Sequence, residues 1–521
     1  MAPIDLDQLT LEAVRGGALA DRPVAVLGLA RSGVALARFF ADAGARVTVY
    51  DGRDAGELER AIGQLEGRAV ELALGPDIDP ADTWLHADLV ATSPSINPDY
   101  PTTEPRLRAA LRHLVDRRAA GDPGAPALVA EADLFLRLCP APTIGVTGTK
   151  GKTTTASLTH AILAADPVHP AVLGGNIGVP LVERLLDLTP DHRVVIELSE
   201  LQLPTLSHGT TVAVYTNVTS DHLDRHGTVE AYRRVKRRLA ELVDPDGALV
   251  INVEDPVVGG YAGLGTAPAV LYRVDRPTPG GVGVADGWIA AASVERLPLA
   301  GGGVAQTGPS GRIMPVGELA IPGRHNVANA LAAVAVGLLF GLAPDAIRRA
   351  AASFDGVEHR LEPVALVDGV RFVNDSQGTQ PDAVVAALRA FEPPVVLIAG
   401  GRDKGIDLTE LAGVVAERAA AAVLIGESGP TLAELFRSAG LGVTERAESL
   451  GEAVRRADTL ARDAVARSGS GAGPATVLLS PAAASFDMFE DYAARGRAFK
   501  AAVAELAAER RQDARTSETR P

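Results

Sequence analysis

The chain has 521 residues, a formal net charge of −15 and only 4% aromatic residues. At roughly 100–200 residues per domain, this length indicates about three domains. So acidic a chain is unsuited to non-specific binding of a phosphate backbone, and no nucleic-acid partner is expected. Cys139 is the only cysteine, which excludes an intramolecular disulfide and a cysteine-based zinc site.

The first residues, MAPIDLDQLTLEA, lack the basic start and the apolar core of a signal peptide. No run of about 18 uncharged apolar residues occurs, so no membrane span is predicted. A cytoplasmic enzyme is therefore expected, and we expect it to be a monomer.

The first part of the chain alternates strands and helices. PVAVLGLA reads as a short buried strand, RSGVALARFFADAG has helical spacing and ends on Gly44, and RVTVYD follows as a second strand. DLVATSPSI reads as a further strand that runs into a polar turn. This order predicts a parallel sheet. The turn-rich segment 118–126 is interpreted as a linker.

Two further α/β units follow. The second contains the strands RVVIELS, TVAVYTNV and GALVINVE, and the third contains VRFVND, PVVLIAGG, AAVLIG and TVLLSP. No element is assigned between Gly259 and Pro315, where Gly, Ala and Pro dominate. The polar segment 506–521 is predicted to be disordered. The predicted domains are 1–128, 129–356 and 357–505.

The strongest local signal is GVTGTKGKTTT, residues 145–155, between an apolar strand and a helix. Glycines let a loop wrap a polyphosphate closely, and the N–H groups of the following helix point at that anion. Lys152 would bridge the terminal phosphates, and the Thr153 hydroxyl would bind magnesium. The pattern G-x-x-x-x-G-K-[ST] fails by one position, because Val146 stands where its first Gly belongs. A Gly-rich turn without a ligand is the alternative interpretation.

At this motif the chain begins to resemble the Mur ligases, a family that has TGTxGKT where most P-loop proteins have a Gly at the start of the motif. The resemblance extends from residue 28 to about residue 500 through motifs in the same order. They are GLARSG, the phosphate loop, GGNIG, IELSELQL, TNVTSDHLDRHG followed by YRRVK, GRHNVANAL, EHRLE, VNDSQGT, AGGRDK and SPAAASFDMF. The dinucleotide-type first segment points to the glutamate-adding branch of the family.

The resemblance implies an α/β protein with three domains: an N-terminal Rossmann-like domain for a UDP-sugar, a central P-loop ATPase with a mainly parallel sheet, and a C-terminal Rossmann-like domain for an amino acid. It implies ligation of D-glutamate to UDP-N-acetylmuramoyl-L-alanine in peptidoglycan precursor synthesis. The γ-phosphate of ATP first goes to the substrate carboxylate, and the amine of the amino acid then attacks the acyl phosphate. Because both steps bring anions together, cations must neutralise them.

The resemblance also implies two magnesium ions held by hard ligands. It places Glu197, which ends RVVIE, and His222 in TNVTSDH at these metals. It singles out Lys236 in the helix EAYRRVKRRLA, whose family equivalent is carbamylated by carbon dioxide and becomes an anionic oxygen ligand. Such chemistry needs a lysine that can lose its proton, which burial favours. The alternative is that Lys236 belongs to the solvated basic face of this helix.

Further contacts are implied at matched positions. For ATP they are Gly148, Thr149, Lys150, Gly151, Lys152, Thr153, Thr154, Asn329, Arg360 and Asp375. For the UDP-sugar they are Ser32, Asp51, Ser93, Asn176 and Ser199. GLARSG is a poor dinucleotide fingerprint, because Ala30 and Arg31 replace small turn residues. Asp51 ends the second strand, where an acid often binds ribose.

The family's amino-acid pocket is matched by Thr379, Lys404, Ser485, Phe486 and Tyr492. Gln377 and Gly378 depart from the family's NDSKAT, and Glu200 and Leu201 replace a Ser and a Phe in IELSELQL. The carboxylate of Glu200 either disturbs the metal site or points the other way along the strand. Neutral Gln377 makes a weaker bond to a carboxylate than a lysine does. We therefore expect glutamate in a shifted pocket, D-glutamate first and L-glutamate as the alternative.

Other functions stay open at this point. Another amide ligase of the superfamily is possible, although folylpolyglutamate synthases begin with the ATPase domain and lack a unit like GLARSG…VTVYD. A nicotinamide-dependent oxidoreductase built on the first domain leaves the phosphate loop unexplained. A regulatory P-loop protein is the fourth option. ATP hydrolysis that needs both the nucleotide-sugar and the amino acid would exclude the two classes that are not ligases.

Overall fold

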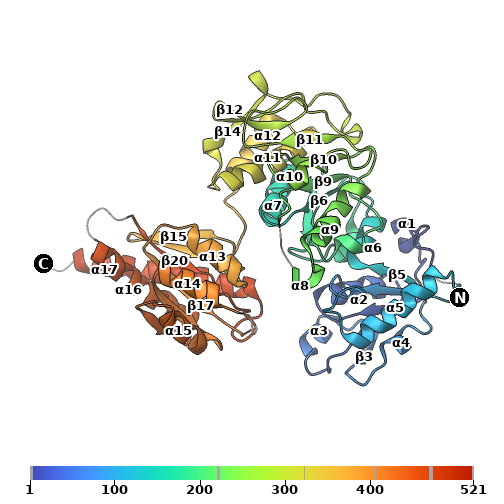
Figure 1. Cartoon of the computed structure of the whole chain (residues 1–521), viewed down its shortest axis with the longest axis horizontal. Coiled ribbons are helices and arrows are strands. Elements are labelled where there is room, and N and C mark those ends of the chain that lie inside the picture. Colours follow the sequence, from blue (N-terminus) through green and yellow to red (C-terminus); the bar gives the residue numbers. More distant parts are fainter. Residues whose placement is uncertain (1–3, 220–222, 322, 404–406, 469–472, 519–521) are drawn as a thin grey trace. The chain divides into compact units, whose positions relative to one another are not determined.

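The computed structural model describes residues 4–219, 223–321, 323–403, 407–468 and 473–518. The chain falls into two compact units, Met1–Phe354 and Asp355–Pro521. Within the described residues, the first unit holds two sheets and the second unit holds one (Figure 1). Most neighbouring strands are parallel, which confirms the predicted α/β class with mainly parallel sheets.

The first sheet has the strand order β3-β2-β1-β4-β5, and every pair in it is parallel. Val24 and Val26 share a core with Phe39 of one flanking helix, whereas Ala25 and Leu27 share another core with residues of α5. This alternation is the period of a strand covered on both faces. The elements are α1 (Leu11–Arg15), β1 (Pro23–Leu27), α2 (Arg31–Asp42), β2 (Arg46–Asp51), α3 (Glu59–Gly63), β3 (Val70–Leu74), α4 (Pro80–Thr83), β4 (Leu89–Thr92), α5 (Pro105–Ala119) and β5 (Ala127–Ala130).

The interpretation of residues 118–126 as a linker is wrong. This segment joins α5 to β5, and β5 pairs with β4 inside the first sheet. A turn-rich composition shows that the chain turns, but it does not show to which sheet the chain returns. The strand that follows, ALVA, is too short for its apolar character to mark it as a sheet member.

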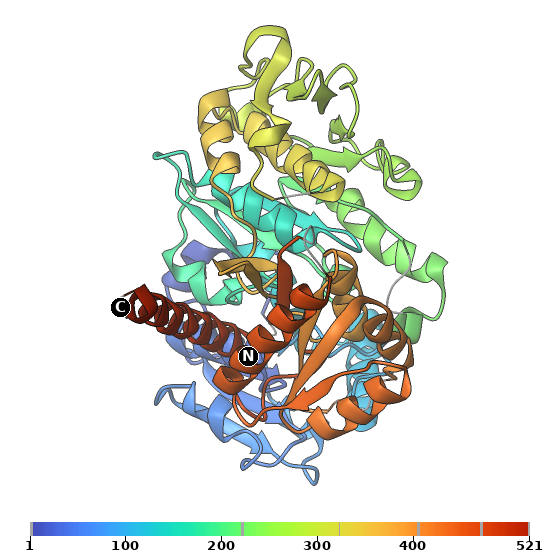
Figure 2. The ribbon, with the colours of Figure 1, turned by 90° about the vertical axis from the view of Figure 1, so that its left-hand side faces the viewer.

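The second sheet has the order β14-β13-β12-β11-β10-β9-β6-β8-β7 and is antiparallel only from β12 to β14. One face packs on α7 (Lys152–Leu163) and α11 (Arg324–Leu339), which lie side by side in Figure 2. A Cβ at Gly337 of α11 would lie 2.8 Å from Ile162 of α7, so this glycine allows the close approach. The other face packs on α9.

The elements of this sheet and its helices begin after β5. The helices are α6 (Glu131–Leu138), α7 (Lys152–Leu163), α8 (Leu223–His226), α9 (Val229–Leu242), α10 (Pro256–Gly259), α11 (Arg324–Leu339) and α12 (Pro344–Ala352). The strands are β6 (Thr143–Thr147), β7 (Ala171–Gly175), β8 (Arg193–Glu197), β9 (Val212–Tyr215), β10 (Ala248–Asn252), β11 (Ala269–Tyr272), β12 (Val282–Ala285), β13 (Trp288–Ala291) and β14 (Arg312–Pro315). The 3₁₀ helices are η1 (Leu181–Asp187), η2 (Leu203–Thr205), η3 (Pro298–Ala300), η4 (Pro309–Gly311) and η5 (Val316–Glu318). Strands β11 to β14 thus occupy the stretch in which the sequence assigns no element.

The second unit has the sheet order β15-β16-β20-β17-β18-β19, with β15 antiparallel at one edge. Helices α13 to α15 cover one face, and α16 and α17 cover the other. The elements are β15 (Glu362–Val367), β16 (Val370–Asn374), α13 (Pro381–Arg389), β17 (Val395–Gly400), α14 (Thr409–Arg418), β18 (Ala419–Ile425), α15 (Gly429–Ser438), β19 (Thr444–Arg446), α16 (Leu450–Ser468), β20 (Ala475–Leu479) and α17 (Tyr492–Glu518).

The predicted disordered tail is wrong for the described residues after 505. Helix α17 continues to Glu518, and Leu506 is buried in the same core as Phe499 and Val503. The segment AELAAERRQDAR contains strong helix formers and neither Gly nor Pro. Glu509 and Arg511 are exposed, so their charge marks the solvent-facing side of this helix and does not exclude a helix.

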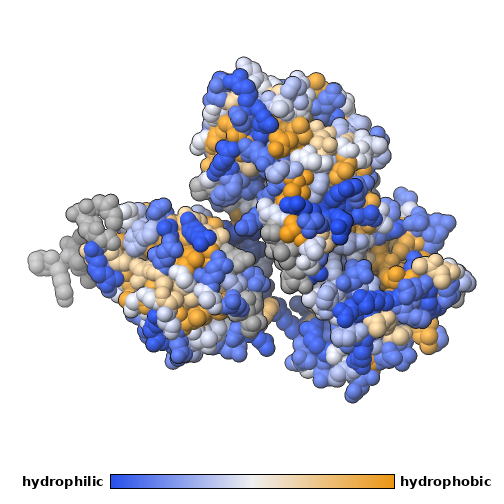
Figure 3. All heavy atoms as spheres, in the orientation of Figure 1, coloured by the Kyte–Doolittle hydropathy of each residue, from blue (hydrophilic) through white to orange (hydrophobic). Residues whose placement is uncertain are grey.

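In the part of the chain that is described, no helix is long and apolar enough to cross a membrane. Exposed large hydrophobic side chains are far apart along the chain, among them Leu85, Val168 and Leu366. In Figure 3, the hydrophobic residues of the visible face stand in separate patches among hydrophilic ones.

Candidate functional site

The phosphate-loop motif forms a strand, a tight loop and a helix, as predicted. Val146 belongs to β6 and pairs with Glu197 of β8, which explains why no glycine is needed at its position. The loop begins instead at Gly148, which has a φ of 147° and where a Cβ would overlap the Thr216 hydroxyl. Gly151 has a φ of 85°, and α7 begins directly after it. The N-terminus of α7 therefore lies at the carboxyl end of β6, a suitable place for an anion.

The segment after β9 fixes the conformation of this loop. The backbone N–H of Thr149 donates to the Asn217 carbonyl at 2.8 Å, and that of Lys150 donates to Asn217 Oδ1 at 2.9 Å. The Thr216 hydroxyl donates to the Lys150 carbonyl at 2.7 Å. The protein itself thus holds the loop in shape, so a ligand need not order it.

The predicted ATP residues of the first unit gather around the loop. Lys152 Nζ donates to the Thr149 carbonyl at 2.9 Å, and Thr153 is buried in the first turn of α7, followed by half-buried Thr154. Asn329 of α11 is buried, and a Cβ at Gly151 would lie 2.6 Å from its Oδ1. Asn329 therefore supports the loop from behind.

Glu197 is buried at the end of β8, the strand beside β6. Its Oε1 accepts a hydrogen bond from Asn176 Nδ2 at 2.8 Å, whereas its Oε2 has no hydrogen-bond partner among the described residues. A buried carboxylate oxygen without a partner is costly, and a hard cation would satisfy it. The described residues contain no cluster of three or more His, Cys, Asp or Glu side chains suited to a metal. His222, the second predicted metal ligand, lies outside the described residues.

Lys236 is fully buried, which rules out the solvated basic face as its place. Its Nζ donates to Thr147 Oγ1 at 3.3 Å and lies 5.5 Å from the centre of the Tyr232 ring. Arg233 and Arg237 of the same helix are exposed. Lys236 is therefore set apart from its basic neighbours and reaches the end of β6.

Sequence reasoning missed Tyr232 and Thr147. The Tyr232 hydroxyl lies 3.0 Å from Thr149 Oγ1 in the phosphate loop, and the Thr147 hydroxyl donates to the Leu198 carbonyl at 2.9 Å. Tyr232 thus links Lys236 to the loop, and Thr147 links it to Leu198, the residue after Glu197. The i, i+4 spacing of Tyr232 and Lys236 was the available signal, because it puts both on one face of a helix.

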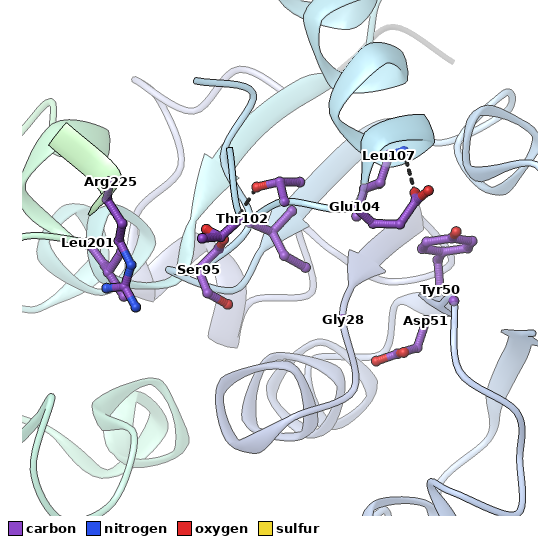
Figure 4. A pocket seen from close by; sticks show the side chains of 12 residues that line it. Gly28, Tyr50, Asp51, Ser95, Thr102, Glu104, Leu107, Leu201 and Arg225 are labelled. Atoms are coloured by element: carbon purple, nitrogen blue, oxygen red, sulfur yellow. Dashed lines mark hydrogen bonds between the residues drawn. The ribbon is translucent and has the colours of Figure 1, made fainter. Parts of the chain in front are cut away.

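A pocket of about 290 Å³ lies at the carboxyl ends of β1 and β2. In Figure 4, Tyr50 and Asp51 lie on one side of this pocket. Leu201 and Arg225, which belong to the part of the chain that forms the second sheet, lie on the other side. The carboxyl ends of parallel strands are the usual place for a nucleotide. It is lined by Gly28, Tyr50, Asp51, Gly52, Ser95, Ile96, Thr102, Thr103, Glu104, Leu107, Leu201 and Arg225.

Asp51 is held firmly in this pocket. Its Oδ2 accepts from the backbone N–H of Leu29 at 2.8 Å and from Arg53 Nη2 at 2.8 Å. Burial acts to raise the pKa of Asp51, but these hydrogen bonds outweigh it, and the pKa lies below its usual value. The carboxylate therefore stays ionised as an acceptor.

None of the three serines predicted for the UDP-sugar, Ser32, Ser93 and Ser199, lines the pocket itself. Ser93 is buried, and its hydroxyl donates to the Leu27 carbonyl at 3.3 Å. Ser32 lies in the first turn of α2. A Cβ at Gly33 would overlap the Gly28 carbonyl, so glycine permits the tight approach of α2 to β1 despite the poor fingerprint.

The departure at Glu200 has a structural explanation. Arg225 Nη1 donates to Glu200 Oε1 at 3.1 Å, so this carboxylate pairs with a residue that lines the pocket. The sequence left two directions open for the Glu200 carboxylate. This pairing agrees with the one in which the side chain points away from the metal site. Ser199 is buried, and its hydroxyl donates to Gln202 Oε1 at 3.0 Å.

In the second unit, the loops after β16, β20 and β17 meet. The Ala482 N–H donates to the Gly378 carbonyl at 2.9 Å, and the Arg402 N–H donates to the Ala484 carbonyl at 2.8 Å. Arg495 lies buried beneath them, and its guanidinium donates to Ser376 Oγ at 3.0 Å and to the Ala483 carbonyl at 3.2 Å. Burial lowers the pKa of Arg495 to about 10. Sequence reasoning missed this residue.

These loops carry most of the predicted amino-acid residues. Ser485 is buried, Thr379 and Tyr492 are half-buried, and Phe486 is 63% exposed. The Tyr492 carbonyl accepts from the Ser376 hydroxyl at 2.7 Å, which ties the start of α17 to the loop after β16. Lys404 lies outside the described residues.

Two further predicted residues belong to the second unit. Asp375 accepts a hydrogen bond from the Ser480 hydroxyl at 2.6 Å, and burial raises its pKa to about 6. A Cβ at Gly378 would overlap Asp375 Oδ2 and lie 2.5 Å from Ser480 Oγ, so the departure to glycine suits this arrangement. Arg360 is exposed beside the Leu361 N–H, which also donates to Asp375.

Glu131 supplies a pH-dependent prediction for stability. Burial at the start of α6 raises its pKa from 4.5 to about 7, so between these values the folded protein keeps a proton that the unfolded chain loses. Stability therefore falls as pH rises from about 4.5 to about 7. Glu131→Gln should be more stable relative to wild type at pH 8 than at pH 4.5 by about 2–4 kcal/mol. Urea unfolding of both proteins at both pH values measures this, and a difference independent of pH would contradict it.

Comparison with known proteins assigns the class. Residues 146–337 match the Mur ligase middle domain, and residues 359–471 match the Mur ligase, glutamate ligase domain. A crystal structure of MurF from Acinetobacter baumannii covers 89% of this chain and 91% of its own at 16% identity, with a TM-score of 0.50, and shows a similar fold. The protein is therefore a ligase of the multidomain α/β type.

Relatives narrow the class further. The UDP-N-acetylmuramoylalanine--D-glutamate ligase of Symbiobacterium thermophilum is 38% identical over 483 residues, which cover 92% of this chain and 98% of that protein. The protein of the same name from Pelotomaculum thermopropionicum is 37% identical over 491 residues, covering 93% and 98%. The chain belongs to the Mur ligases, in the family of these D-glutamate ligases.

Proposed function

We propose that this protein uses ATP to ligate D-glutamate to UDP-N-acetylmuramoyl-L-alanine through an acyl phosphate, in the cytoplasm and as a monomer. The observation that carries the proposal is the phosphate loop at Gly148–Lys152 beside Glu197, whose buried Oε2 lacks a hydrogen-bond partner among the described residues. The names of the relatives supply the identity of the substrates.

The central sheet is the proposed P-loop ATPase. Lys152 and the first turn of α7 would hold the phosphates of ATP, and Asn329 would keep the loop in place. Thr153, Glu197, His222 and a carbamylated Lys236 would hold two magnesium ions, which neutralise charge when the γ-phosphate meets the substrate carboxylate. The unpartnered oxygen of Glu197 and the complete burial of Lys236 support this assignment.

The outer sheets are the proposed Rossmann-like domains. At the first sheet, Asp51 and the pocket of Figure 4 would receive the nucleoside. Ser32 and Ser93 would contact the diphosphate, and Asn176 and Ser199 would contact the sugar. At the third sheet, Thr379, Lys404, Ser485, Phe486 and Tyr492 would receive the amino acid. Arg360 and Asp375 would contact ATP from this domain.

The handedness of the amino acid provides a direct test. Phosphate-free enzyme is given ATP, Mg²⁺ and UDP-N-acetylmuramoyl-L-alanine, and ADP release is measured with D-glutamate, L-glutamate and D-aspartate. We expect D-glutamate to have the highest kcat/KM, even though Gln377 replaces a lysine, because its amide can still donate to a carboxylate. A preference for L-glutamate would refute the D-assignment and retain the ligase. No activity with any amino acid would refute the proposed function.

A further inference from the structure

Arg31 is one of the residues by which GLARSG departs from a dinucleotide fingerprint. Its side chain extends from α2 to a loop that follows β7 of the second sheet. Its Nη1 donates to the Gly178 carbonyl at 3.0 Å, and its Nη2 donates to the Asn176 carbonyl at 3.3 Å. Both carbonyls belong to the connection between β7 and η1, residues 176–180, which we term the asparagine loop. Arg31 is thus the first residue of α2, and its guanidinium also binds two carbonyls of a loop that is distant in the sequence.

Helices that follow strands of the first sheet pack on the segment in which this loop ends. Glu131 opens α6 directly after β5 and is buried. Helices α2 and α6 both pack on η1, where the loop ends. The asparagine loop is therefore hydrogen-bonded to Arg31 and continues into a 3₁₀ helix that α2 and α6 hold in place.

The asparagine loop in turn sets the position of Glu197. The Asn176 side chain donates to Glu197 Oε1 at 2.8 Å, and its backbone N–H donates to the Glu197 carbonyl at 2.9 Å. A Cβ at Gly175 would lie 2.5 Å from that carbonyl, so the two strand ends are closely packed. With Oε1 engaged by Asn176, Oε2 is the oxygen left for a cation.

We propose that Arg31 is a positioning residue that couples the nucleotide-sugar site to the carboxylate of Glu197 through the asparagine loop. The inference rests on the proposed function, because it takes α2 as the diphosphate side of the substrate site and Glu197 as a magnesium ligand. Arg31 adjoins Ser32 at the start of α2, so an anion bound there lies beside the residue that holds the loop. Arg31 acts through Asn176 and does not itself contact the metal.

The test separates metal binding from nucleotide binding. In the full-length Arg31→Gln enzyme we expect the Mg²⁺ concentration for half-maximal activity to rise roughly tenfold and kcat to fall by a similar factor. The dissociation constant of UDP, measured by calorimetry without ATP, should change less than about twofold. Arg31→Lys keeps the charge but not the two-armed contact, so it should give an intermediate Mg²⁺ requirement.

Arg15 supplies a matched control. Like Arg31, it is an exposed arginine near the start of the chain. Its Nη2 donates to the carbonyls of Leu186 and Leu188, both at 2.8 Å, and neither residue belongs to the asparagine loop. Arg15→Gln should leave the Mg²⁺ requirement unchanged, and an equal rise in both variants would overturn the proposal. A weaker UDP affinity with an unchanged Mg²⁺ requirement would also overturn it, since Arg31 would then be a phosphate ligand. Failure of wild-type enzyme to bind UDP would instead refute the proposed function.

Discussion

Replacement of Lys236 by alanine is expected to lower kcat by roughly 10³-fold. Lys236 is fully buried, and its Nζ lies against Thr147 at the end of β6, next to the strand that carries Glu197. If it acts as a carbamate, its loss removes an anionic oxygen from the metal site. The measurement is steady-state ADP release at saturating substrates, with melting temperature as a check on folding.

Added carboxylate provides the sharper part of this test. Acetate or formate should restore part of the activity of Lys236→Ala, because a small anion can enter the vacated space and offer an oxygen to the metal. Arg237→Ala is the control: Arg237 lies on the same helix but is exposed and pairs with Glu241 at 2.7 Å. This variant should keep its activity and gain nothing from acetate. Full activity of Lys236→Ala without any addition would refute the carbamate.

The strands were predictable wherever an apolar run is bounded by turn residues. PVVLIAGG became β17, buried along its whole length between two helical layers, and such a run leaves little choice of structure. The region around β11 to β14 was not predictable, since its strands are only four residues long and are separated by glycine turns. Pairing with distant partners defines such strands, and a local pattern does not contain that information.

The site shows the same limit at the level of single residues. The motif order located Glu197 and Lys236, but only the fold tells that Lys236 is buried while Arg237, one residue on, is exposed. Glu200 could face either way on sequence grounds, and its direction depends on Arg225, which lies 25 residues further along. Arg495 was missed because its partners are carbonyl oxygens and a hydroxyl of distant loops, for which no sequence pattern exists.

Replacement of Lys152 by alanine is expected to lower kcat by roughly 100- to 1,000-fold, equivalent to about 3–4 kcal/mol of lost transition-state stabilisation. Lys152 is the first residue of α7, and its Nζ is held over the phosphate loop by the Thr149 carbonyl at 2.9 Å. The ammonium is thus placed at the mouth of the loop, where charge accumulates as the γ-phosphate is transferred. An interaction that strengthens in the transition state affects kcat more than KM for ATP.

Lys152→Arg separates charge from position in this prediction. Arginine keeps the positive charge, but its planar group is larger and cannot take the place of a compact ammonium, so an intermediate loss is expected. Both variants should melt close to wild type, because Lys152 is half-buried and Asn217 and Thr216 hold the loop independently of it. If Lys152→Ala kept near-normal turnover, the loop would not be a phosphate loop, and the functional reading of Glu197 beside it would lose its support.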